Sequence, residues 1–210
     1  VSFRWRDREV NVDAGGSFAV MNALFALEVV AALGVPVVDA ARAARGIRPV
    51  TGRFETVTGT DGYSVIVDYA HTPEALRTVL HSVRELTTGR IIVVFGCGGD
   101  RDTGKRAEMG RVVEELADAA FVTSDNPRTE DPEAIMAEVL SGMTGGNCEA
   151  VSIVDRAVAI ESAISTAGSA DIVVIAGKGH EPYQEIAGEF LAFSDVEVAR
   201  DAVTRRSGSR

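Results

Sequence analysis

The chain has 210 residues, enough for one well-packed core and a smaller second unit. With 46% hydrophobic and 25% charged residues, its composition is that of an ordinary globular protein. The formal net charge of −10 argues against a nucleic-acid-binding protein that works through bulk charge. No apolar run reaches the roughly 18 residues of a membrane span. We therefore expect neither nucleic acid nor a membrane among its partners.

The cysteines and the first residues bear on where the protein works. Cys97 and Cys148 lack the spacing of a metal site, and we interpret them as reduced thiols of a cytoplasmic protein. The opening sequence VSFRWRDREV is too charged for a signal peptide. It starts with Val rather than Met, which suggests a processed chain or part of a longer one.

The first residues predict a small unit of their own. Residues 1–12 are typical of a hairpin. The mostly apolar run over 17–34 indicates a helix that stops at a glycine, and a second short helix is expected over 37–45. Pro49 interrupts both helix and strand, so we expect a domain boundary near it.

From Arg53 onward, strands and helices alternate. Apolar, β-branched runs such as SVIVD, IIVVF and DIVVIAG are typical of strands buried on both faces. Single helices between them favour a doubly wound α/β fold with a mainly parallel, six-stranded, Rossmann-like sheet. The expected strands lie near 54–58, 64–68, 91–95, 120–123, 150–153 and 172–176. The expected helices cover 73–87, 105–117, 132–141, 155–167 and 195–205, with Thr72 and Asp131 as caps, a late hairpin over 183–193 and a frayed tail from Thr204.

Unusual polar sequences follow four of these strands. DYAHTP follows SVIV, GCGGDRDTGKR follows IIVVF, SDNPR follows FVT, and GKGHE follows DIVVIA. In open parallel sheets, ligands bind at the carboxyl ends of the strands. Four loops rich in charge and glycine therefore predict a binding site along one edge of the sheet.

The sequence VTSDNPR, residues 122–128, ends a strand and begins a turn. Pro127 fixes its own φ and restricts the asparagine before it, so Asp125 and Arg128 stay close with opposite charges. Such a pair suits a zwitterion, because the guanidinium can fork onto a carboxylate while the carboxylate takes an ammonium. The alternative is a solvated turn with an internal Asp125–Arg128 pair.

Residues 99–105, GDRDTGK, match the G-x-x-x-x-G-K pattern of a phosphate-binding loop. That pattern requires Ser or Thr next, to hold Mg²⁺, and the next residue is Arg106. Asp100 and Asp102 would also oppose a phosphate. We therefore favour a loop in which Arg101 points into the site and the following Lys-Arg pair opens the next helix.

The remaining loops give weaker signals. The two glycines of GKGHE, residues 177–181, give the backbone freedom. Its glutamate could accept an ammonium, and its lysine and histidine could add charge or transfer a proton. In DYAHTP, Asp68 and His71 could bind a ribose or a phosphate, or His71 could instead cap the following helix.

Together these motifs resemble a known family. GRFE, VDYAHTPEAL, VFGCGGDRDTGKR, TSDNPR and AGKGHE stand in this order and at spacings that closely resemble the Mur ligases of peptidoglycan biosynthesis. The resemblance runs over nearly the whole chain and is most specific from Arg53 to Glu181. The sequence DNPR looks like that of members that add meso-diaminopimelate rather than L-lysine.

The resemblance also implies a domain organisation. Known members have a UDP-binding domain, a central ATPase domain and a C-terminal amino-acid-binding domain. Residues 1–48 resemble the end of the central domain, and residues 49–210 resemble the whole C-terminal domain. The chain has no counterpart of the family's GTNGKT-like P-loop, modified lysine or Mg²⁺ ligands. ATP and Mg²⁺ are thus implied as cofactors held mostly outside this chain, which by itself is expected only to bind the amino acid.

Roles for single residues follow from the same resemblance. The residues implied to bind meso-diaminopimelate are Arg101, Asp125, Asn126, Pro127, Arg128, Gly177 and Glu181. Those implied to face the nucleotide are Asn22, Arg53, Asp68 and His71. Asn22 matches the second Asn of a G-x-F-N-x-x-N segment near the adenine, whose first Asn is Ala19 here. Neither a catalytic residue nor a metal ligand is implied in this chain.

The implied chemistry is amide formation by way of an acyl phosphate. ATP phosphorylates the D-glutamyl γ-carboxylate of UDP-MurNAc-L-Ala-D-Glu, and an amino group of diaminopimelate then attacks it. The first hypothesis is therefore the C-terminal part of an ATP-dependent ligase, expected to be monomeric. The alternatives are a free-standing amino-acid-binding module, a lysine-adding ligase and a P-loop phosphotransferase. Folylpolyglutamate synthetases share the architecture but are not expected to combine DNPR with GKGHE.

Overall fold

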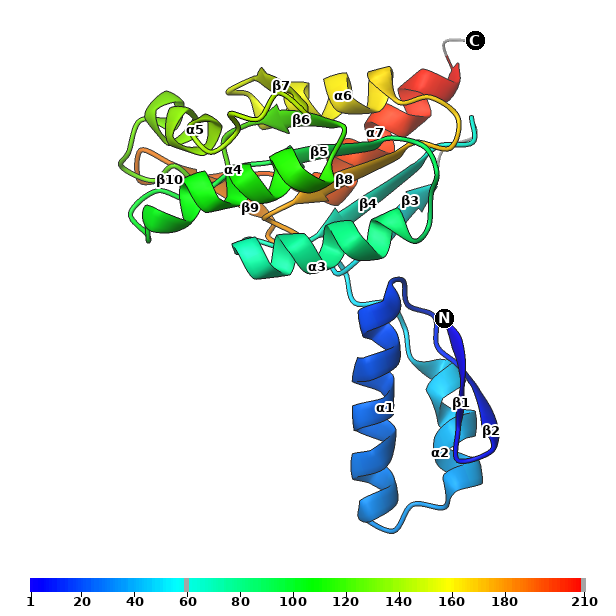
Figure 1. Ribbon diagram of the computed structural model, residues 1–210. Coiled ribbons are helices and arrows are strands. Elements are labelled where there is room, and N and C mark those ends of the chain that lie inside the picture. Colours follow the sequence, from blue (N-terminus) through cyan, green and yellow to red (C-terminus); the bar gives the residue numbers. More distant parts are fainter. Residues whose placement is uncertain (59–60, 209–210) are drawn as a thin grey trace. The chain divides into compact units, whose positions relative to one another are not determined.

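The computed structural model describes residues 1–58 and 61–208 and divides the chain into two compact units, Val1–Val50 and Thr51–Arg210. Each unit has its own hydrophobic core and its own sheet (Figure 1). None of the helices described is long and apolar enough to cross a membrane. The second unit holds the four polar loops and is the one that matters for the site.

The first unit is a hairpin packed on two helices. Its core gathers Trp5, Val10 and Leu27, and the Trp5 indole donates to Glu28 at 2.7 Å. An aromatic ring thus contributes apolar area while its N–H finds a partner. The elements are β1 Ser2–Trp5, β2 Arg8–Asn11, α1 Ser17–Ala32, α2 Val37–Ala43 and the 3₁₀ turn η1 Ala44–Gly46.

The second unit is built on a six-stranded sheet in the order β3-β4-β8-β5-β6-β7. All neighbours pair in parallel except β3 and β4, which are antiparallel. This confirms the doubly wound, mainly parallel sheet expected from the sequence. The strands are β3 Glu55–Thr58, β4 Ser64–Asp68, β5 Ile91–Phe95, β6 Ala119–Val122, β7 Glu149–Ser152 and β8 Ile172–Ala176.

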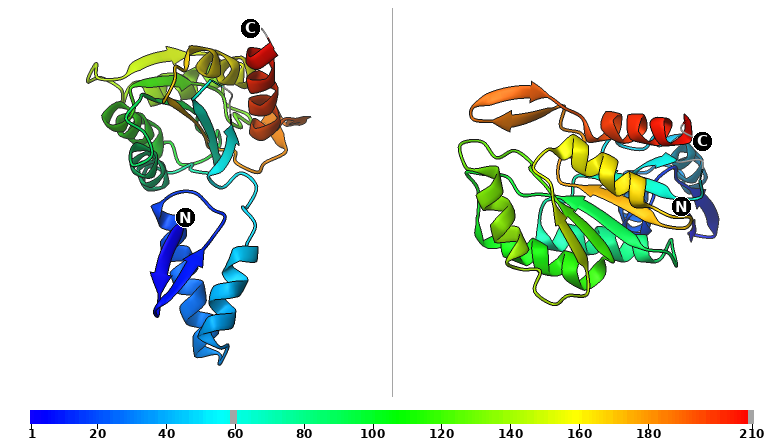
Figure 2. Two further views of the ribbon diagram at one scale, coloured as in Figure 1. Left: turned by 90° about the vertical axis from the view of Figure 1, so that its right-hand side faces the viewer. Right: turned by 90° about the horizontal axis from the view of Figure 1, so that it is seen from above.

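Helices cover both faces of the sheet, which explains why β5 and β8 are apolar throughout. One core joins inward side chains of the strands to α6 and α7, and α3, α4 and α5 lie on the opposite face (Figure 2). Each valine or isoleucine buried this way contributes about 1.5–3 kcal/mol. The helices are α3 Pro73–Arg84, α4 Gly104–Leu116, α5 Pro132–Leu140, α6 Arg156–Thr166 and α7 Asp195–Gly208.

Local signals set the helix ends. Thr72 and Asp131 accept from backbone N–H groups of the first turn, as expected of caps. The helix expected over 73–87 ends earlier, at Arg84, because Thr87 turns away and donates to the carbonyl of Ala170. The expected fraying of the tail is wrong up to Gly208.

Arg206 is the reason that the tail stays helical. It donates to the carbonyl of Ala167 at 2.6 Å, and its guanidinium lies 4.5 Å from the ring centroid of Tyr63. A late hairpin, β9 Tyr183–Ile186 and β10 Glu189–Ala192, turns at Ala187 and Gly188 as the sequence predicts.

Candidate functional site

A cavity of about 480 Å³ lies at the carboxyl ends of β4, β5, β6 and β8. The four polar loops expected to share this edge do meet here. The lining residues are Tyr69, His71, Thr72, Gly96, Cys97, Gly98, Arg101, Asp102, Lys105, Asp125, Asn126, Arg128, Gly177 and Glu181. Six of the seven residues implied to bind the amino acid are among them; Pro127 is buried behind the cavity, where Gly99 packs against its carbonyl oxygen.

The turn after β6 is clamped on two sides. On one side, the N–H of Gly99 donates to the carbonyl of Asn126 at 2.9 Å. On the other, Arg128 exchanges backbone hydrogen bonds with the β9 hairpin, receiving one from Ala187 at 2.7 Å and donating one to Glu185 at 3.0 Å. The clamp holds Arg128 at a φ of 54°, a left-handed conformation that non-glycine residues rarely adopt.

The Arg128 guanidinium has fixed partners of its own. Its Nη1 donates to the carbonyl of Gly99 at 2.7 Å, and its Nε lies 3.0 Å from a carboxylate oxygen of Glu185. The internal Asp125–Arg128 pair that the sequence left open as an alternative does not form; Glu185 takes that place. The fork is therefore oriented before any ligand arrives, with Arg128 among the residues that line the cavity.

Asp125 is a buried carboxylate that lines the cavity, with 9% of the residue exposed. Among the residues described, none donates a hydrogen bond to its side chain. Burial raises the pKa of this carboxyl, and the positive charges of Arg156 and Lys178 oppose the shift without cancelling it. An ionised carboxylate in this position gains most from a cation that enters the cavity.

Lys178, Asn126 and Glu181 form a network at the cavity wall. The fully buried Lys178 ammonium donates to Asn126 Oδ1 at 2.8 Å and to Glu181 Oε2 at 3.0 Å. Asn126 donates to the same Glu181 oxygen at 2.8 Å. Burial raises the pKa of Glu181, but these hydrogen bonds outweigh it, so the pKa lies below its usual value. Glu181 is thus ionised and already compensated, which leaves Asp125 as the stronger candidate for an ammonium.

In the loop that matches a phosphate-binding pattern, residues 99–105, the charged side chains form contacts within the protein instead. Asp102 accepts from the N–H of Gly104 at 2.9 Å, and Asp100 accepts from the hydroxyl of Thr129 at 2.8 Å. These contacts occupy a loop amide that a phosphate would need, and the two carboxylates would repel a phosphate. Arg106 is buried and ion-paired with Glu130 at 2.8 Å.

The cations of this loop have different surroundings. Arg101 lines the cavity, is exposed, and contacts only a neighbouring carbonyl, that of Asp100 at 3.0 Å, among the described residues. Lys105 reaches the carbonyl of His71 at 2.8 Å and so ties the loop after β5 to the loop after β4. Arg101 is thus the cation of the loop with most freedom to meet a ligand.

Of the residues implied to face a nucleotide, His71 lines the cavity, whereas Arg53, Asp68 and Asn22 are not part of its lining. The exposed Arg53 guanidinium lies 4.3 Å from the Tyr69 ring centroid, and the exposed His71 ring contacts the carbonyl of Tyr69 at 2.8 Å. Asp68 is buried and accepts from the backbone N–H groups of Phe54 and Ala70 at 2.7 and 2.8 Å. Its carboxylate therefore positions the segment that carries Arg53.

Asn22, the remaining residue implied to face the nucleotide, belongs to the first unit. Asn22 is exposed on α1 of the first unit, and its role stays a prediction. Within the described part of the chain, no group of three or more His, Cys, Asp or Glu side chains is arranged to hold a metal ion. The exposed Arg53 and His71 could contact a nucleotide's phosphates or ribose.

Three charged residues near the cavity were missed from the sequence: Glu185, Arg156 and Asp195. The sequence gives no indication that Glu185 pairs with Arg128, because this contact depends on how the β9–β10 hairpin folds back. Arg156 does give an indication. It opens α6, where the helix dipole favours acidic residues, and an arginine there suggests a specific partner.

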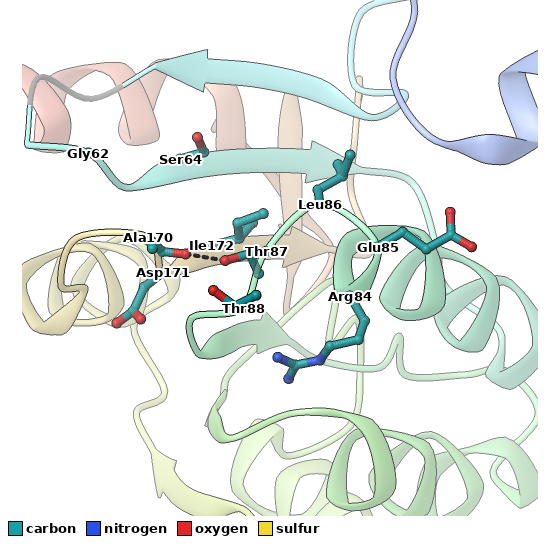
Figure 3. A pocket seen from close by; sticks show the side chains of 10 residues that line it. All are labelled: Gly62, Ser64, Arg84, Glu85, Leu86, Thr87, Thr88, Ala170, Asp171 and Ile172. Carbon is teal, nitrogen blue, oxygen red and sulfur yellow. Dashed lines mark hydrogen bonds between the residues drawn. The ribbon is translucent and has the colours of Figure 1, made fainter. Parts of the chain in front are cut away.

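A second cavity, of about 400 Å³, lies at the amino ends of β4 and β8 (Figure 3). Its lining residues are Gly62, Ser64, Arg84, Glu85, Leu86, Thr87, Thr88, Ala170, Asp171 and Ile172. Arg84 already pairs with Asp118 at 2.7 Å, and Asp171 with Arg90 at 2.8 Å. Paired charges of this kind favour a structural role, so we assign the site to the carboxyl edge.

Comparisons with known proteins identify the family to which this chain is related. The family model "Mur ligase, glutamate ligase domain" matches residues 52–179. A UDP-N-acetylmuramoyl-L-alanyl-D-glutamate--2,6-diaminopimelate ligase of Gloeobacter violaceus is 48% identical over 192 residues, covering 91% of this chain and 39% of that protein. The enzyme of the same name from Chromobacterium violaceum is 44% identical over 206 residues, covering 97% and 41%.

Solved structures of related ligases also match the chain. A structure of a UDP-N-acetylmuramoyl-L-alanyl-D-glutamate--2,6-diaminopimelate ligase matches with a TM-score of 0.72 at 39% identity, covering 95% of this chain and 41% of that one. A bifunctional folylpolyglutamate synthase/dihydrofolate synthase of Yersinia pestis matches with a TM-score of 0.64 at 22% identity, covering 85% and 41%, which shows a shared fold. The chain spans about two fifths of the length of these relatives.

Proposed function

Because the chain belongs to the Mur ligase family, we propose that it is part of an ATP-dependent ligase that joins meso-diaminopimelate to UDP-N-acetylmuramoyl-L-alanyl-D-glutamate. Residues 49–210 would be the amino-acid-binding domain, and residues 1–48 the end of the central ATPase domain. The two free, buried thiols support a cytoplasmic location. A monomer is the expected state.

One observation carries this proposal: the cavity combines the buried Asp125 carboxylate with the Arg128 guanidinium, which is already held in one orientation. No described residue donates a hydrogen bond to the Asp125 carboxylate, while Arg128 is held in place by Gly99 and Glu185. Arg101 adds a second cation on the neighbouring loop. An amino acid with an ammonium and two carboxylates matches this charge pattern better than one with a single carboxylate.

The chain's own residues would bind and orient the nucleophile. Arg128 would hold a terminal carboxylate, and Asp125 would take an ammonium. With both ends of the amino acid fixed, the reacting amine can be presented in one orientation. ATP with Mg²⁺, bound mostly by the rest of the enzyme, would activate the acceptor carboxylate by phosphorylation. Arg53, His71 and Asn22 would face that nucleotide, and Asp68 would act through Arg53.

The test is a comparison of ligands on the 210-residue chain by titration calorimetry. We expect meso-diaminopimelate to bind more tightly than L-lysine by about 30-fold to several thousand-fold, because lysine offers no second carboxylate to the Arg128 guanidinium. Arg128→Ala should abolish most of this preference. Arg128→Lys should restore only part of it, since one ammonium cannot reproduce the fork.

The matched control is Arg111→Ala, which removes an exposed arginine of α4 outside the cavity and should leave both affinities unchanged. Equal binding of the two amino acids by the unmodified chain would contradict the assignment of Arg128 as a carboxylate selector.

A further inference from the structure

Arg156 lies beneath the cavity with no exposed side-chain surface. It is the first residue of α6, and its guanidinium faces Asp195, the first residue of α7, which is equally buried. The two side chains form a bidentate pair, with Nε and Nη2 of Arg156 at 2.7 and 2.8 Å from the two carboxylate oxygens. This planar geometry fixes the direction of the guanidinium.

The same guanidinium also joins two loops of the cavity. It donates to the carbonyl of Ala176 at 3.0 Å and reaches the carbonyl of Ser124 at 3.4 Å. These residues directly precede Gly177 and Asp125. They extend from β8 and β6, which are not neighbours in the sheet because β5 lies between them. Arg156 therefore spans three strands and links loops that no strand pairing holds together.

Asp125 lies within reach of the charge of Arg156. A Cβ built on Gly177 would come 2.6 Å from Asp125 Oδ2 and 3.9 Å from Arg156 Nη2, so all three groups share one small space. The charged groups that act on Asp125 are Arg156, Lys178, Asp195 and Glu181. Arg156 is the stronger of the two cations that oppose the effect of burial on the pKa of Asp125.

We propose that Arg156 is a positioning residue for this cavity. It fixes the spacing between the Asp125–Arg128 turn and the Gly177–Glu181 loop, and it balances the Asp125 carboxylate until an ammonium group of the ligand binds. The identity of that ligand rests on the proposed function. A buried guanidinium needs acceptors for its remaining N–H groups, and here the carbonyls that supply them lead directly into two loops of the site.

The experiment uses the double variant Arg156→Met/Asp195→Leu, which removes both buried charges together and leaves no orphaned ion. Two quantities are measured on the 210-residue chain: the pKa of Asp125, from its carboxyl carbon shift by NMR, and the dissociation constant of meso-diaminopimelate. We expect Asp125 to titrate at higher pH than in the unmodified chain. The dissociation constant should rise by about tenfold or more.

Arg156→Lys separates the two roles, because it keeps the charge but loses the fork. The pKa of Asp125 should stay near its original value while the affinity remains reduced. This variant also carries the test if the double variant does not fold.

The matched control is Arg90→Met/Asp171→Leu, which removes an Arg–Asp pair at the opposite edge of the sheet and should change neither quantity. Unchanged titration and affinity in a folded double variant would overturn the proposal. If the unmodified chain binds no meso-diaminopimelate, the proposed function fails, but the titration of Asp125 still decides the role of Arg156.

Discussion

The amino and carboxyl edges of the central sheet are formed by the same strands. They differ in how deeply their charged side chains are buried and in how those side chains are paired. At the amino edge, Arg84 pairs with Asp118 while both side chains stay 43% exposed, and Thr87 closes the loop onto the carbonyl of Ala170 (Figure 3). At the carboxyl edge, Arg156 and Lys178 are fully buried, and none of the described residues donates a hydrogen bond to the Asp125 carboxylate.

The difference shows at which edge of the sheet the charged side chains affect the free energy of unfolding. Exposed pairs cost little and contribute little, so the amino edge can tie its loops together with ordinary surface chemistry. Buried charges must be held by several partners, and a buried carboxylate without a donor costs stability unless a ligand completes it. Among the described residues, Asp125 is such a carboxylate at the carboxyl edge, and this supports the proposed binding site there.

The largest expected effect is on the fully buried pair. Asp195→Ala leaves the Arg156 guanidinium without its counter-ion, and we expect the free energy of unfolding to fall by about 3–5 kcal/mol. Arg84→Ala, at the amino edge, should cost at most about 1 kcal/mol, because its ion pair is half exposed. Urea unfolding followed by circular dichroism measures both. Similar losses in the two variants would mean that burial does not separate the edges.

Replacing one buried aspartate by asparagine should change the free energy of unfolding by a smaller amount, and with opposite sign at the two edges. Burial raises the pKa of Asp171, but hydrogen bonds from Gly168 and Arg90 outweigh it, so the pKa lies below its usual value. Asp171→Asn should therefore lower the free energy of unfolding at neutral pH by about 1–3 kcal/mol, as for hydrogen bonds to charged groups. Asp125→Asn should raise it, because the native carboxyl is buried with its pKa above normal.

The pH dependence gives the same contrast. The folded pKa of Asp171 is depressed, so its contribution is present above the unfolded pKa and is lost as pH falls through the folded pKa. The folded pKa of Asp125 is raised, so this group takes stability away as pH rises from its unfolded to its folded pKa. Unfolding curves of both Asn variants across the acidic range should converge with the unmodified chain at low pH. A stabilising Asp171→Asn would refute the contrast.

The smallest expected difference is between the two thiols, which should behave alike. Cys97 lines the cavity and Cys148 lies just before β7, and burial raises the pKa of each to about 12. At mildly alkaline pH, iodoacetamide should label both roughly a thousandfold more slowly than an exposed cysteine, because only the thiolate reacts. Mass spectrometry of the labelled chain checks this, with the urea-unfolded chain as reference. Rapid labelling of Cys97 alone would show an open cavity wall.

Much of this organisation could be predicted because it is local in the sequence. Unbroken, β-branched apolar runs such as IIVVF favour strands covered on both faces, and polar residues directly after parallel strands meet at one edge. The partners of the site residues could not be predicted. The pairing of Arg128 with Glu185 depends on the path of a hairpin, and that of Arg156 with Asp195 on the docking of two helices. Neither is encoded in spacing.

The strand order has a consequence for how the molecule assembles. β8, residues 172–176, lies between β4 and β5, which precede it in the chain by several complete helices and strands. Until β8 is inserted, β4 and β5 each present an open edge toward a gap. Contacts between such distant segments form slowly, so we expect the insertion of β8 to be a late step in the folding of this sheet. Because Gly177–Glu181 follows β8, the binding cavity is completed only then, and partly folded chains expose apolar strands but no site.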